Sequence, residues 1–335
     1  MPRNAKQYLS EEQLNAILSS IGKVRVGVLG DFCMDIYWHA DMTRSTLSRE
    51  TPHFPLPVVS ERMSPGAAGN VAANIAALQP KKLIVLGAIG KDWRGALLKD
   101  ALSALGAEVR MTESEGRMTN AYIKPMMKGT SDVVYEAPRL DFENDKALDC
   151  GAEEQLIEAL REAAQSLDVL CVCDQMVNGC VTDRVREAVM QLAEEGLTVI
   201  ADSRDNIGKF RNVIVKPNDI EAARALGRGP VPPGEAAEQL SGMTGKPAVV
   251  TAGPDGCWLC AGETAVNIPA FPVECPIDIC GAGDSFLSAF ACCIGGGADE
   301  LHAAAVGNLA SSVTIQKIGM TGTATREELR EAYNR

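Results

Sequence analysis

Short apolar runs alternate with longer amphipathic stretches along most of this chain. The apolar runs predict buried strands at 24–29, 82–87, 168–173, 197–202, 213–215 and 247–252. Between them, hydrophobic positions recur at helical spacing and predict helices at 11–21, 68–78, 93–105, 152–165, 182–195 and 218–226, with three more inside 282–334. Continuous apolar strands separated by amphipathic helices are typical of a parallel sheet covered on both faces. The pattern therefore predicts an α/β protein with a mostly parallel sheet.

Two stretches interrupt this alternation. Residues 37–62 contain three prolines and a short apolar pair at 58–59, and residues 119–137 alternate polar and apolar positions around a turn at 128–131, which predicts a hairpin. Both follow predicted strand ends, where α/β proteins bind ligands. We therefore expect 37–62 and 113–137 to form a small β lid over a core made of 1–36, 63–112 and 138–335.

Composition and charge narrow the function classes. The net charge is −12 and no basic run of five residues occurs, which argues against nucleic-acid or anionic-membrane partners. The 11 cysteines lie mostly in apolar contexts, which favours reduced thiols and a cytoplasmic location. We see neither a signal peptide nor an apolar run of 18 residues.

Few residues of this chain suit a metal site or a Ser-His-Asp triad. Only three histidines occur, which disfavours both hydrolase classes. Cys257 and Cys260 have the spacing of half a zinc site, but no second pair completes it, so we expect these residues to belong to a strand.

The most informative segment runs from Asp278 to Asp284 and leads into an apolar helical run. Gly281, Ala282 and Gly283 predict a loop at a helix N-terminus, where free N–H groups and the helix dipole favour an anion such as phosphate. A carboxylate beside a transferring phosphoryl group can take the proton of an attacking hydroxyl. Asp284 is therefore a candidate general base.

Three further segments suggest ligand contacts, each with a structural alternative. Gly66 and Asn70 lie in a small-residue run that enters a helix; it could bind a polyhydroxyl ligand or simply pack against the sheet. Asp31 and Asp35 follow the first strand and could accept hydrogen bonds from sugar hydroxyls or cap a helix. The segment Lys216–Glu221 could hold Mg²⁺ through water with Asn218 and Glu221, or those two residues could form a capping box.

Together, and in this order, these segments resemble the ribokinase (PfkB) family of sugar kinases. The likeness includes residues 66–95, the run 278–286, the Asn-x-x-Glu motif at 218–221 and the strand and turn 251–256, and it spans about 24–322. It implies a three-layer α/β/α sandwich with a β lid, an ATP-dependent transfer to a sugar hydroxyl, and Mg²⁺ as cofactor.

The same resemblance implies a role for each matching residue. Asp284 would be the base, with the N–H groups of Gly281, Ala282 and Gly283 as the anion hole. The remaining residues fall into three groups: sugar-binding residues Asp31, Asp35, Gly66, Asn70 and Arg139; nucleotide-binding residues Asn218, Glu221, Thr251, Gly253, Gly256 and Asn308; and Asp278, with Cys280, at a monovalent cation site for K⁺.

Within the family, the chain is most similar to the heptose 7-phosphate kinase branch, through the segments 30–38, 48–59 and 139–143. Arg139 and Arg204 could meet a phosphate or form surface ion pairs. The chain departs from that branch at Asn178, where a lysine is usual, so the substrate could lack that phosphate. A kinase for another sugar or a nucleoside therefore stays open, as does a non-catalytic sugar- or nucleotide-binding regulator.

Two other enzyme classes fit the sequence less well. No G-x-G-x-x-G motif follows a strand, which disfavours a dinucleotide oxidoreductase. The Gly245-Lys246 pair continues into Pro247 rather than Ser or Thr, which disfavours a P-loop kinase. A lid strand that completes its sheet on a second copy would give a homodimer, which we also expect.

Overall fold

The computed structural model describes residues 5–319 and 321–335, and within these ranges the strands form two sheets. The larger sheet has nine strands, in the order β14 (Val266–Ile268), β13 (Cys257–Cys260), β12 (Ala248–Thr251), β11 (Ile214–Val215), β10 (Thr198–Ser203), β9 (Val169–Asp174), β1 (Arg25–Gly30), β4 (Lys82–Gly90) and β5 (Glu108–Ser114). All pairings from β5 to β12 are parallel, and β13 and β14 add an antiparallel edge. The predicted mostly parallel sheet is confirmed.

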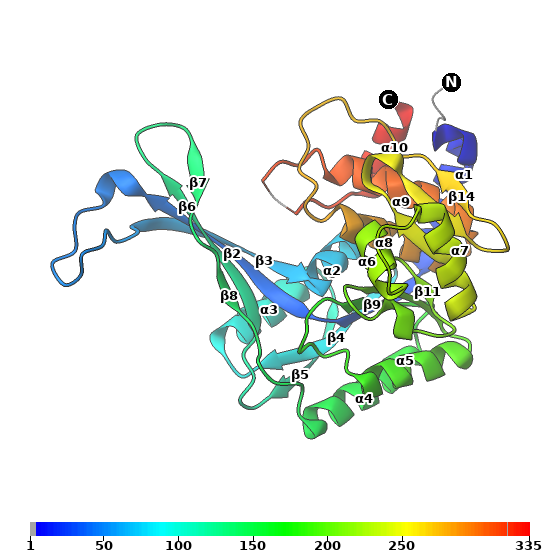
Figure 1. Cartoon of the computed structure of the whole chain (residues 1–335), viewed down its shortest axis with the longest axis horizontal. Helices are drawn as coiled ribbons and strands as arrows, with labels where there is room; N and C mark the ends of the chain where they lie inside the picture. The colour runs from blue at the N-terminus through cyan, green and yellow to red at the C-terminus, as the bar shows by residue number, and fades with distance from the viewer. Residues whose placement is uncertain (1–4, 320) are drawn as a thin grey trace.

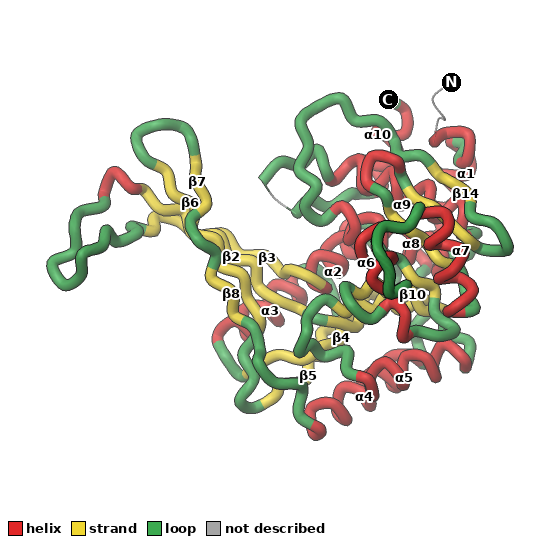
Figure 2. Tube along the Cα trace, viewed as in Figure 1, coloured by secondary structure: helices red, strands yellow, loops and turns green. Residues whose placement is uncertain are grey.

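Helices cover both faces of this sheet (Figures 1 and 2). One face carries α1 (Glu11–Ser20), α2 (Ala68–Ala77), α3 (Trp93–Ala104), α8 (Ala282–Gly295), α9 (Glu300–Thr314) and α10 (Arg326–Asn334). The other carries α4 (Cys150–Ala164), α5 (Asp183–Glu194), α6 (Asp219–Ala225) and α7 (Pro233–Thr244). Each layer of helices encloses its own cluster of buried apolar side chains against the sheet, so the chain forms the three-layer sandwich that the sequence predicts.

The second sheet projects from one side of this core (Figure 1, left). Its strands run in the order β3 (Val58–Ala67), β2 (Phe32–Asp41), β6 (Asn120–Lys128) and β7 (Val134–Glu136), and β8 (Leu140–Phe142) pairs with β6. The antiparallel pairing of β6 with β7 confirms the hairpin expected around residue 128. Because β2 begins two residues after β1 ends and β3 leads directly into α2, the lid is joined to the core at the strand ends.

Three parts of the chain differ from the sequence pattern or were left unassigned by it. Residues 32–41 form the long strand β2, which the sequence pattern did not delimit although 37–62 was expected to belong to a β lid, because their partners in β3 and β6 come from distant sequence. Helix α7 lies in a stretch with no predicted element. Its proline at the first turn and the left-handed Gly245 after its end are both helix-boundary signals. Strand β5 was also unassigned and forms the edge of the large sheet beside β4.

The cysteines and the helix lengths bear on two earlier expectations. All eleven cysteines are free thiols, and the predicted strand at 257–260 is β13. In the described ranges, no helix is long and apolar enough to cross a membrane.

Candidate active site

Asp284 lies in the first turn of α8, beside the carboxyl ends of the central strands. The helix starts after Gly281, whose φ of +79° places it in the left-handed region that glycine adopts without strain. A methyl group on Gly281 would also lie 2.8 Å from Nδ2 of Asn70. A tight turn and a helix N-terminus thus bring backbone N–H groups next to a carboxylate, as the sequence predicts, although the N–H of Ala282 already donates to the carbonyl oxygen of Ile279 at 3.2 Å.

The surroundings of Asp284 bring its pKa closer to neutral than that of an ordinary aspartate. Burial raises the pKa of its carboxyl to about 6, although a hydrogen bond donated by Asn70 lowers it. The Asn70 Nδ2 to Asp284 Oδ2 distance is 2.5 Å. A general base works best when its pKa lies near the working pH, so this carboxylate is ionised at pH 7 yet more basic than an ordinary aspartate.

Two asparagines of α2 fix the start of α8. Asn74 donates from Nδ2 to the carbonyl oxygen of Asn70 (3.0 Å) and accepts at Oδ1 from the hydroxyl of Ser285 (2.9 Å). Both asparagines are buried. Asn70 is expected from the sequence to bind sugar; the structure places its amide on the candidate base, so it orients Asp284.

A buried ion pair that the sequence did not single out lies beside the expected anion hole. Nζ of Lys216 is 3.2 Å from Oδ2 of Asp202, and the two side chains are 3% and 8% exposed. Burial lowers the pKa of Lys216, but Asp202 and Glu221 outweigh it and the net shift is upward. A methyl group on Gly283 would lie 3.7 Å from Nζ of Lys216, so a permanent positive charge faces the helix N-terminus. The sequence feature that could have identified this ion pair is a lysine directly after a predicted buried strand.

Asp35, Gly66 and Ser64 form the lid side of the site. Asp35 on β2 pairs with Ser64 on β3, and a methyl group on Gly66 would lie 2.5 Å from Oδ2 of Asp35. Burial raises the pKa of Asp35, and its charge in turn raises the pKa of Asp284. The hydroxyl oxygen of Ser64 is buried without a hydrogen-bond partner in the described chain. A carboxylate and an unpaired hydroxyl side by side suit a ligand rich in hydroxyl groups.

Asp31 has a different environment from Asp35. Its carboxylate accepts hydrogen bonds from the backbone N–H groups of Gln175 (2.9 Å), Met176 (2.9 Å) and Cys180 (2.7 Å). Burial raises its pKa to about 6, although each of these three hydrogen bonds lowers it. Asp31 therefore holds the loop after β9 in place, and sugar contact by this residue stays a prediction.

The residues expected to bind nucleotide border the end of β12. Asn218 forms an isolated bridge with Thr251, and Gly253 and Gly256 form the turn that follows. Asn218 and Glu221 form a capping box, with bonds of 2.9 and 2.8 Å, so the structural alternative is confirmed. The buried amide of Asn308 donates to the carbonyls of Ile268 (2.9 Å) and Pro269 (3.1 Å) and joins α9 to the segment after β14.

Two charged candidates are already partnered. Asp278 accepts from the N–H groups of Cys280 and Gly319, each at 3.0 Å, and so shapes the loop before Gly281. Arg139 makes a two-bond fork to Asp141, with both distances 2.6 Å. The ion-pair alternative for Arg139 is confirmed. Arg204 instead lines a hollow of about 80 Å³ with Asn178.

The site fits Mg²⁺ only through water. No group of three or more His, Cys, Asp or Glu residues within the described ranges could hold a metal ion. The capping box uses Oδ1 of Asn218 and Oε2 of Glu221, which leaves the other Glu221 oxygen for a hydrated cation.

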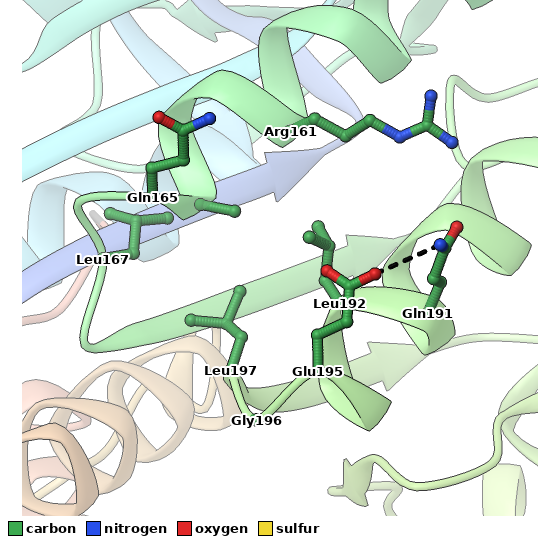
Figure 3. Close-up of a pocket in the computed structure, with 9 residues that line it drawn as sticks. Arg161, Gln165, Leu167, Gln191, Leu192, Glu195, Gly196 and Leu197 are labelled. Carbon is green, nitrogen blue, oxygen red and sulfur yellow. Dashed lines mark hydrogen bonds between the residues drawn. The ribbon is translucent and has the colours of Figure 1, made fainter.

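The hollow of about 440 Å³ in Figure 3 lies elsewhere. It lies between the C-terminal ends of α4 and α5, and Arg161, Gln165 and Glu195 are among its lining residues. The strands β9 and β10 begin next to this hollow and end near Asp174 and Asp202. The hollow therefore lies at the amino ends of these strands, whereas Asp284 lies near the carboxyl ends.

Comparison with known proteins shows the family and the fold of the chain. The pfkB family carbohydrate kinase profile matches residues 41–326. The bifunctional protein HldE of Azorhizobium caulinodans is 32% identical over 321 residues, which cover 92% of this chain and 64% of that protein. HldE of Gluconobacter oxydans is 31% identical, with 91% and 63% covered. The chain thus spans just under two thirds of the length of these relatives.

Solved structures share the fold. Phosphofructokinase-2 from Escherichia coli, in complex with fructose-6-phosphate, has a TM-score of 0.74 at 20% identity, covering 93% of this chain and 98% of that chain. Ribokinase from Arabidopsis thaliana, complexed with ribose and ATP, has a TM-score of 0.66 at 19% identity, covering 93% and 99%. With a family profile that matches most of its length and a ribokinase-like fold, the chain belongs to the pfkB family of carbohydrate kinases.

Proposed function

We propose that this protein transfers the γ-phosphoryl group of ATP to a hydroxyl of a sugar or sugar phosphate, with the anomeric hydroxyl of heptose 7-phosphate as the favoured acceptor. One observation carries the proposal: Asp284, with a pKa of about 6, lies at a helix N-terminus, close enough to the lid carboxylate Asp35 and the buried Lys216 for both charges to act on its pKa. The sequence likeness to the heptose 7-phosphate kinase branch supports the choice of acceptor.

The chain's own residues account for the transfer. Asp35 and the hydroxyl of Ser64 orient the sugar, and Asp284 takes the proton as the sugar oxygen bonds to phosphorus. The bond from the γ-phosphorus to the bridging oxygen breaks, and ADP leaves with that oxygen. The N–H groups of Gly281, Ala282 and Gly283 hold the phosphoryl oxygens, and Lys216 balances their charge.

The nucleotide lies on the other side of the anion hole in this proposal. Asn218, Thr251 and the turn through Gly253 and Gly256 border it, with Asn308 behind them. Mg²⁺ would reach Glu221 through water and supply neutralisation of the phosphate charge. A monovalent cation such as K⁺ would bind beside Asp278, where the carboxylate shapes the loop before Gly281.

The lid also supports a homodimer. Strands β3 and β7 are at the edges of the small sheet, and Val58, Val59, Val134 and Tyr135 on them are exposed. Unpaired strand edges with apolar side chains favour pairing with a second copy. Light scattering on the purified protein tests this, and a monomer at working concentration would end the dimer proposal.

The kinase proposal is tested by ATP consumption with Mg²⁺ and K⁺. The acceptors are matched pairs of a sugar and its terminal phosphate ester with five, six and seven carbons, plus nucleosides. Turnover that depends on one acceptor and falls roughly 10²- to 10⁴-fold in Asp284→Asn, with ATP binding retained, is expected for loss of a general base. Full activity in Asp284→Asn contradicts its role. If ATP is consumed with none of the acceptors although it still binds, a non-catalytic binding protein is favoured.

A further inference from the structure

Three side chains on one face of the lid form what we call the lid cation cluster: Tyr37 on β2, Arg62 on β3 and Lys124 on β6. Tyr37 pairs with Arg62 across one strand boundary and with Lys124 across the other. The guanidinium of Arg62 lies 4.0 Å from the centre of the Tyr37 ring. Nζ of Lys124 lies 4.8 Å from the same ring and 3.1 Å from its hydroxyl. The tyrosine thus holds two positive charges together.

Among the described residues, neither cation in this cluster has a direct ion-pair partner. Within the described residues, Lys124 has the Tyr37 hydroxyl as its hydrogen-bond partner and Arg62 has the carbonyl oxygen of Gly319, at 3.0 Å, and both acceptors are uncharged. Arg139, by contrast, donates two hydrogen bonds to the carboxylate of Asp141. Two unpaired cations side by side in a protein with a net charge of −12 call for an anionic partner.

The cluster lies one step along the lid from the residues that would hold the sugar. Asp35 lies two positions before Tyr37 on β2, and Ser64 lies two positions after Arg62 on the antiparallel β3, on the same face, which corresponds to roughly 7 Å. Lys124 also lies close enough to Asp35 and Cys280 to influence the pKa of both groups. The cluster therefore lies on the lid next to Asp35, whose charge in turn raises the pKa of Asp284.

We propose that the lid cation cluster binds the phosphate ester that the acceptor sugar already carries, so that this kinase selects phosphorylated sugars. This inference rests on the proposed function and deepens it. A sugar whose reacting hydroxyl lies at Asp284 and whose chain passes Asp35 brings a terminal phosphate to Arg62 and Lys124. Arginine and lysine donors recognise phosphate by charge-assisted hydrogen bonds. The cluster supplies a phosphate contact in place of the lysine that is usual at the position of Asn178.

Lys124→Met tests the site with little change in shape, because methionine keeps most of the lysine stem. Lys128→Met is the matched control: Lys128 is on the same strand, exposed at the lid tip and paired with Asp132 at 3.0 Å. For the acceptor pair that the enzyme uses, kcat/KM with the phosphate ester should fall on the order of 10- to 100-fold in Lys124→Met. With the unphosphorylated sugar, and for the KM of ATP, the change should stay below about threefold.

The outcomes separate this inference from the kinase proposal. Turnover that prefers the unphosphorylated sugar, or an equal loss for both members of the pair in Lys124→Met, keeps the kinase and overturns the phosphate site. A rise confined to the KM of ATP also overturns it, because the cluster would then contact nucleotide. If no acceptor is turned over, thermal unfolding with inorganic phosphate decides. Stabilisation of the wild type and Lys128→Met but not of Lys124→Met supports the site, and equal shifts in all three refute it.

Discussion

Replacing Asp284 with asparagine should stabilise the folded protein while it removes activity. The carboxyl has a pKa of about 6 in the folded state against an ordinary value of 3.8, because burial disfavours its charge. Between pH 3.8 and about 6 the folded state therefore keeps a proton that the unfolded state has lost. As a result, the free energy of unfolding of the wild type falls as the pH rises through this range. Asparagine has the same shape and no charge, so the penalty disappears.

The size of the effect follows from the shift. A difference of about two pH units corresponds to about 3 kcal/mol above pH 7, and roughly half of it is present at pH 5. The hydrogen bond from Asn70 is stronger to a carboxylate than to an amide, which reduces the gain. We expect a net gain of about 1–3 kcal/mol at pH 8, or a melting temperature higher by about 1.5–4 °C for 335 residues.

Melting temperatures of the wild type and Asp284→Asn, measured from pH 5 to pH 8 in one buffer series, check this expectation. The difference should grow with pH and level off above about 7. Asp100→Asn, at an exposed position on α3, serves as the control and should show no growing difference. A variant less stable than the wild type at pH 8, or a difference that ignores pH, would refute the assignment of Asp284 as a desolvated base.

Three further substitutions test the site from other directions. Asp31→Asn should destabilise the fold by about 2–5 kcal/mol in chemical denaturation, despite a similar pKa of about 6, because the amide cannot accept all three backbone N–H bonds. Asn70→Ala should move the acid limb of the kcat/KM profile to higher pH, because the hydrogen bond that lowers the pKa of Asp284 is lost; an unmoved limb contradicts this. Gly281→Ala should lower kcat at least tenfold, measured at saturating ATP, because the left-handed turn is strained and the added methyl group meets Asn70.

Local sequence patterns were sufficient to predict most of the fold. Apolar strands alternating with amphipathic helices are a property of neighbouring residues, so the order of elements and the parallel sheet could be predicted. Capping boxes at Ser10 and Asn218 follow the same logic, since donor and acceptor lie three residues apart. The bounds and pairing of strand β2 could not be predicted, beyond its place in an expected β lid, because its partners are supplied by segments that begin some 25 and 90 residues later.

The candidate site shows the same division. The glycine-rich turn and Asp284 are contiguous, and their chemistry can be read from the chain alone. The pKa of Asp284, the Lys216–Asp202 pair, the attachment of Asp31 to the loop after β9 and the lid cation cluster all depend on residues that only the fold brings together. Sequence by itself determined which groups are available and where helices and strands begin. Tertiary structure decided which charges are buried, which are paired and which stay free for a ligand, because burial and distance set electrostatic energies.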